Sequence, residues 1–109
     1  MGTENRLSYM PEDGHQRKEL LLELEAVINE PGGIENPQLK QALENLHEHQ
    51  RILLAQALSI IRRGIRLLHQ IDQRKAAALV PLVLKLDVST EAEQKSTLEE
   101  IPNLVRPRT

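Results

Sequence analysis

The sequence of 109 residues contains no cysteine, no phenylalanine and no tryptophan, and Tyr9 is its only aromatic residue. Without cysteine, disulfides and thiolate metal sites are excluded, and the composition fits a cytoplasmic protein. Without bulky aromatic side chains, a core must be built from Leu, Ile, Val and Ala, which interlock well between helices. A chain of this length forms one domain at most.

Long hydrophobic runs are also missing. Apolar stretches are a few residues long, and arginines at 62, 63 and 66 interrupt the most apolar region, so no transmembrane helix and no membrane insertion are expected. The first residues, MGTENRLSYMPEDG, have no apolar signal core. The formal net charge of −2 argues against a wholly basic nucleic-acid binder.

The N-terminal third predicts an arm followed by a helix. Residues 1–13 are polar and are expected to form a disordered arm, because they contain little to bury. Leucines recur at helical spacing from residue 15 to residue 30, with Asp13 as the candidate N-cap. Pro31, Gly32 and Gly33 end this helix. The short connector that follows predicts an antiparallel second helix, within a helical domain over residues 14–88.

Residues 36–71 carry the strongest pattern in the chain. Asn36 can cap a helix whose first residue is Pro37. Apolar or small residues then recur at alternating spacings of three and four for about five heptads, as in a coiled-coil seam. The pattern predicts one long helix over about 37–78, so the expected fold is mainly α, a helical hairpin. At 1.5 Å per residue this helix would span about 60 Å.

The two predicted helices differ in length, and the difference predicts a dimer. The first helix spans only about 24 Å and would leave much of the second uncovered. Exposure of that face would forfeit several kcal/mol, against a net stability of about 5–15 kcal/mol. We therefore expect a homodimeric helical bundle, with Gly64 allowing close approach of a second backbone. The predicted interface comprises Leu53, Ala57, Ile60, Ile61, Gly64, Leu67, Leu68 and Ile71.

The C-terminal third is less regular. Apolar residues alternate over 82–88 after Pro81, which leaves two interpretations: an extended or helical cover packed on the bundle, or a strand paired with another chain. Thr90 and Glu93 fit a capping box. Residues 89–109 are therefore expected to form a short helix, ending near residue 100, and a frayed tail.

Positive charge is concentrated in the middle of the chain. Residues 51–75 hold six Lys or Arg and one acidic residue, a net of +5, whereas the other residues hold 8 basic and 15 acidic residues, a net of −7. Three interpretations remain: a solvated face, a face for an acidic protein surface, or a face for nucleic acid or anionic membrane. The predicted partner-binding basic face comprises Arg62, Arg63, Arg66, Arg74 and Lys75.

No catalytic, cofactor or metal site is predicted. His47 and His49 are two residues apart, so they point in different directions on a helix and cannot share a metal. No serine has a plausible histidine and aspartate context, and no glycine-rich loop precedes a helix with a lysine. The sequence therefore favours a non-catalytic protein–protein interaction module, such as an adaptor, assembly factor or small regulator. One alternative is a dimeric nucleic-acid-associated regulator that uses residues 62–75. Another is a component of a toxin–antitoxin or phage-type assembly, for which the size and shape of the chain are the only indications.

Overall fold

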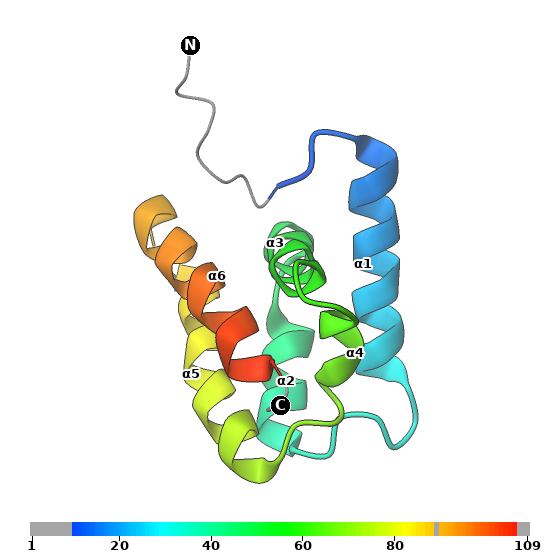
Figure 1. Ribbon diagram of the computed structural model, residues 1–109, viewed down its shortest axis with the longest axis vertical. Coiled ribbons are helices and arrows are strands. Elements are labelled where there is room, and N and C mark those ends of the chain that lie inside the picture. The colour runs from blue at the N-terminus through cyan, green and yellow to red at the C-terminus, as the bar shows by residue number, and fades with distance from the viewer. Residues whose placement is uncertain (1–9, 89, 107–109) are drawn as a thin grey trace.

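The computed structural model describes residues 10–88 and 90–106, and this part of the chain folds into six helices with no strand (Figure 1). The prediction of a mainly α fold is confirmed. The helices are α1 (Gly14–Asn29), α2 (Pro37–Asn45), α3 (Glu48–Ser59), α4 (Gly64–Leu67), α5 (Gln73–Val88) and α6 (Glu91–Val105). The radius of gyration of 13.3 Å is that of a compact chain of this size.

The predicted helix starts are confirmed by their caps. The Asp13 carboxylate accepts a hydrogen bond from the His15 amide at 2.9 Å. The Asn36 side chain accepts one from the Leu39 amide at 2.9 Å, with Pro37 as the first residue of α2. These bonds satisfy amide groups that have no partner inside the helix.

The prediction of one long helix over 37–78 is wrong, because the chain breaks three times in this range. Leu46 is extended, with φ −67° and ψ 140°, and ends α2. Arg63 is left-handed, with φ 59°, between α3 and α4. Asp72 directly precedes α5, and its carboxylate accepts a hydrogen bond from the Lys75 amide at 2.8 Å. After each break the next helix packs its apolar face against the same core. The heptad pattern in the sequence is therefore compatible with several short helices.

The interpretation of 82–88 as a strand or other extended segment is wrong, because α5 continues through Pro81 to Val88. A proline removes one hydrogen bond to the carbonyl group four residues earlier, which is that of Ala77. Both Pro81 and Ala77 are exposed, so water can reach this carbonyl group. Val83 and Leu86 are fully buried, so the interpretation of 82–88 as a helical cover is correct.

The last helix is longer than predicted. Instead of ending near residue 100, α6 continues through Pro102 to Val105. Leu98, Ile101 and Val105 fall on one face and are at most 2% exposed, so residues 102–105 are not a frayed tail. The predicted frayed residues 107–109 lie outside the described residues.

The predicted disordered arm lies outside the described residues as far as residue 9. Of the rest, Pro11 is buried. The Arg17 guanidinium donates hydrogen bonds to the carbonyl oxygens of Pro11 at 2.6 Å and Glu12 at 3.1 Å. The segment just before α1 is therefore attached to that helix.

The helices pack around α3, which Figure 1 shows almost end-on between α1 on one side and the α5–α6 pair on the other. Helix α3 contacts α1, α4 and α6, while α5 packs against α2 and α6. Six of the twelve residues of α3 are buried: Ile52, Leu53, Leu54, Ala55, Ala57 and Leu58. The face that was expected to need a second chain is covered by α1, α4 and α6 of the same chain.

Candidate functional site

The predicted dimer interface does not form a surface. Five of its eight residues are buried inside the single chain: Leu53, Ala57, Ile61, Gly64 and Leu68. Leu67 and Ile71 are half-buried, and only Ile60 is exposed, at 58%. A second copy has no access to the buried five, so Ile60 is the one exposed residue that the predicted interface offers to a second copy.

Gly64 does allow a close backbone approach, but the approaching backbone belongs to the same chain. A β-carbon at this position would collide with the carbonyl oxygen of Leu58 and with the Ile61 side chain. The amide of Gly64 donates to the carbonyl oxygen of Ile61 at 3.0 Å, which closes the turn between α3 and α4. Glycine here therefore serves the tight turn.

The predicted basic face is split into two groups. Arg62, Arg63 and Arg66 lie in the α3–α4 turn and in α4, and all three are exposed. No ion pair in the described ranges joins any of them to a carboxylate. Arg74 is exposed at the start of α5, and next to it Lys75 is half-buried and donates to the carbonyl oxygen of Arg106 at 3.2 Å.

Arg74 and Lys75 border an open groove of about 410 Å³, which is the candidate functional site. The groove lies where the connection between α4 and α5 meets the C-terminal end of α6. It is lined by Leu67, Gln70, Ile71, Asp72, Arg74, Lys75 and Val105. Leu67, Ile71 and Val105 supply apolar surface, whereas the other four residues are polar or charged.

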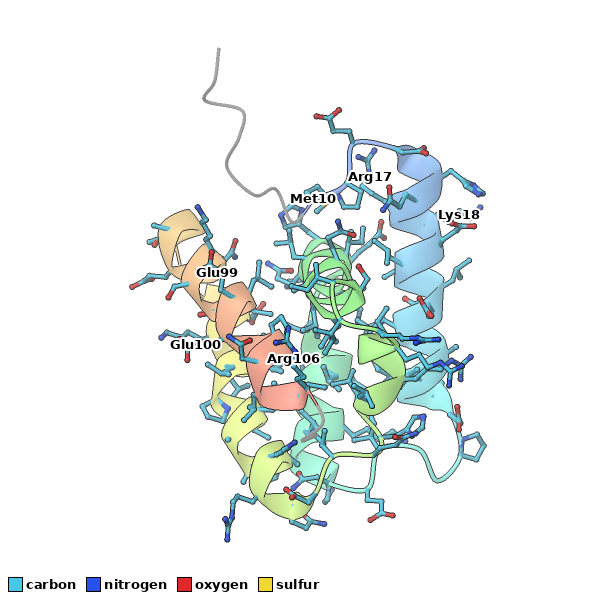
Figure 2. All side chains as sticks on the ribbon, in the orientation of Figure 1. Met10, Arg17, Lys18, Glu99, Glu100 and Arg106 are labelled. Carbon is cyan, nitrogen blue, oxygen red and sulfur yellow. The ribbon has the colours of Figure 1, made fainter. Side chains whose placement is uncertain are left out.

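The charge around this groove is positive. Arg74 and Lys75 lie at its edge, and Figure 2 shows Arg106 at the end of α6, on the side facing α4. Asp72 is the only acidic residue among the lining residues, and one of its carboxylate oxygens caps α5. An apolar surface beside two cations, with a single carboxylate that already caps a helix, is suited to an apolar side chain with nearby carboxylates.

Arg51 belongs to the basic segment 51–75 but holds the fold together instead of facing a partner. Its guanidinium lies 3.1 Å from the Glu25 carboxylate on α1 and donates to the carbonyl oxygen of Glu44 at 2.7 Å. The Arg51 side chain is only 18% exposed. Three helices, α1, α2 and α3, therefore meet at this residue.

Sequence reasoning missed Val105 and Arg106, because both were placed in a frayed tail. Their contribution depends on α6 continuing past Pro102, and no local pattern shows this. Asp72 was a usable signal, since aspartate is a preferred N-cap and marks the start of a separate helix. That signal would have placed Arg74 and Lys75 at a helix start instead of within a long helix.

A second cavity, bordered by Leu39, Leu68, His69 and Ala76, has a volume of about 10 Å³ and fits one water at most. Within residues 10–88 and 90–106, no three His, Asp or Glu side chains gather into a metal-binding group. None of the described helices combines the length and apolar content required to span a bilayer.

A comparison of the sequence with known protein families found no match, and comparisons with curated proteins and with solved structures found none either.

Proposed function

We propose that this protein is a non-catalytic protein–protein interaction module, an adaptor, assembly factor or small regulator. Its groove between α4, α5 and α6 binds an acidic amphipathic segment of a partner. The observation that carries the proposal is the combination of Leu67, Ile71 and Val105 with Arg74 and Lys75 in one open groove. Apolar anchors from the partner enter the groove, and carboxylates beside them face the cations.

The groove is suited to a short segment and not to a large rigid surface. A volume of about 410 Å³ accommodates a few side chains. Most of the binding free energy in such contacts comes from a few buried anchors, while exposed charges mainly speed association. Binding is therefore expected to depend on the apolar residues for its lifetime and on the basic residues for its rate.

Affinity capture from cells of the source organism tests this proposal. The groove variant combines Ile71→Ser with Arg74→Glu. The control variant combines Leu84→Ser with Lys85→Glu, which makes the same kinds of change further along the chain on α5, at residues that are both exposed. We expect partners bound by the wild type to be lost from the groove variant and kept by the control. Equal capture by all three proteins contradicts the proposal.

Self-association remains part of this proposal, although the predicted coiled-coil seam cannot form the contact between two copies. The residues predicted for that seam are mostly inside the core, so the homodimer has to form through exposed surface. Sedimentation measurements that give twice the chain mass of 12.4 kDa support it. A monomer at every concentration removes self-association and leaves the groove proposal standing.

One observation favours nucleic-acid binding as a second candidate. Arg62, Arg63 and Arg66 are exposed and have no carboxylate partner in the described ranges. Phosphate contacts of this kind weaken steeply with salt. We expect no shift of duplex DNA or RNA at about 0.15 M salt, where charges farther apart than about 8 Å are screened. A tight shift at that salt concentration favours the second candidate.

A further inference from the structure

The turn between α3 and α4 presents an exposed apolar side chain among arginines. Ile60 is 58% exposed, although Leu58 and Ile61 beside it are at most 7% exposed. Arg62 and Arg63 follow directly in the same turn and are exposed. The turn therefore combines a large exposed apolar side chain with unpaired guanidinium groups. This combination is typical of binding surfaces, because arginine and apolar anchors are enriched at interfaces.

The backbone of this turn is both strained and tightly held. Arg63 adopts φ 59° and ψ 29°, a left-handed conformation that glycine or asparagine adopts at lower cost. The turn is closed by the hydrogen bond from the Gly64 amide to the Ile61 carbonyl oxygen, and Gly64 has no room for a side chain. Strained residues of this type concentrate at functional sites. This backbone strain is a second feature of the turn that points to a binding role.

The outer face of α1 has the complementary composition. Leu22 is 55% exposed. It lies on one row of the helix with Lys18, which Figure 2 shows projecting from the side of α1 away from α3. Glu19 and Glu23, four residues apart, form the neighbouring row, and both are exposed. This face offers an apolar side chain next to two carboxylates and one cation, Lys18, and one of the carboxylates, Glu19, also lies 3.2 Å from His15.

We infer that the α3–α4 turn of one copy docks on the outer face of α1 of a second copy. Ile60 packs against Leu22, and Arg62 and Arg63 face Glu19 and Glu23. Two-fold symmetry uses both surfaces of each copy and closes the assembly as a dimer. The inference specifies the self-association named in the proposed function and does not involve the groove.

Another copy is the occupant that the charges favour. The carboxylates that the turn requires are present on the chain itself, because Glu19 and Glu23 are both exposed. Among the described residues, the large exposed hydrophobic side chains are Leu22, Ile60 and Leu84. Of these, only Leu22 has two exposed glutamates on the adjacent helical row.

Charge reversal on each surface tests this inference. One variant carries Arg62→Glu and Arg63→Glu, and the other carries Glu19→Arg and Glu23→Arg. Each variant alone brings like charges together. At every protein concentration from about 10 µM to about 1 mM, we therefore expect the wild type to sediment with twice the mass of 12.4 kDa and each variant to sediment with a mass of 12.4 kDa. Mixed in equal amounts, the two variants restore both charge pairs, and we expect the dimer mass to return.

Matched controls separate this interface from general charge effects. Glu99 and Glu100 are exposed and project from α6 away from α1 and α4 (Figure 2). Reversing both to Arg is expected to leave the dimer mass unchanged. Ile60→Ser is expected to dissociate the dimer with helical circular dichroism retained, whereas Leu84→Ser is not.

Three outcomes overturn the inference: a wild-type monomer throughout this range, a dimer that both charge-reversed variants keep, or dissociation by the Glu99 and Glu100 reversal. In each case, partner capture through the groove is unaffected, so failure of this interface is distinguishable from failure of the proposed function.

Discussion

The backbone carbonyl oxygen of Leu58 occupies the space that a β-carbon on Gly64 would need. The last turn of α3 and the first residue of α4 therefore touch backbone to backbone. This contact sets where the chain reverses after α3. It also determines where Ile60 and the arginines of the turn are exposed.

Gly64→Ala is expected to lower the free energy of unfolding by about 1–3 kcal/mol, because the added carbon forces the turn to shift. For a domain of this size, that corresponds to a drop in melting temperature of about 4–8 °C per kcal/mol. Gly14→Ala is the matched control. A β-carbon there meets only the flexible Arg17 side chain, at 3.6 Å, so its melting temperature should stay the same or rise. Equal losses in both variants would show that Gly64 is not confined.

Arg63→Gly is expected to raise the free energy of unfolding by up to about 1.5 kcal/mol. It removes a left-handed arginine, which costs about 1–2 kcal/mol, and adds the backbone entropy cost of glycine, about 0.5–1 kcal/mol. Arg62 does not have a positive φ, so Arg62→Gly should lower stability by about 0.5–1 kcal/mol. Urea unfolding of dilute protein measures both. The same sign of change in the two variants contradicts the strain at Arg63.

The Arg51–Glu25 pair is expected to stabilise the contact between α3 and α1. A double-mutant cycle of Arg51→Ala and Glu25→Ala should give a coupling free energy of about 0.5–1 kcal/mol, since both side chains are partly exposed. Arg51→Ala alone should cost more, about 1.5–3 kcal/mol, because it also removes the hydrogen bond to the Glu44 carbonyl oxygen.

The capping box of α6 makes stability depend on pH at the acid end. Hydrogen bonds from the Thr90 amide and then from the Thr90 hydroxyl lower the pKa of Glu93 below its ordinary value of 4.5. A lowered pKa in the folded state contributes stability that is present above pH 4.5 and is lost as the pH falls through the lowered value. The wild type should therefore be more stable than Glu93→Gln at pH 7, and the difference should shrink below about pH 4.5.

Urea midpoints of the two proteins at pH 7, 5 and 3 measure this effect. Glu99→Gln on the exposed side of the same helix is the control for the loss of one carboxylate. A constant difference between the wild type and Glu93→Gln at all three pH values contradicts the role of the ionised Glu93 side chain.

Several features of the fold follow from short stretches of sequence. The start of α1 at Asp13, the start of α2 at Asn36 and Pro37, and the capping box at Thr90 and Glu93 were all predicted correctly. Each depends on hydrogen bonds between residues at most three positions apart. Neighbouring residues are sufficient to determine such bonds, so a sequence read locally predicts them.

The breaks within 37–78 and the positions of the binding surfaces depend on the whole chain. A heptad pattern is compatible with one long helix or with short helices that present the same face to a core. Closing the core with α1 and α6 buries Leu53, Ala57 and Leu68 within one chain, which favours the short helices.

The same distant contacts determine the helix ends and the groove. Helices were predicted to end near residues 78 and 100, but α5 and α6 continue through Pro81 and Pro102, because Val83, Leu86 and Val105 bury apolar surface further along. Leu67, Arg74 and Val105 come together in one groove for the same reason. The sequence by itself determined the helical class, the caps and the concentration of positive charge, whereas contacts between distant helices decided what was buried and what remained available for binding. Burial depends on residues far apart in the chain, and no local pattern records it.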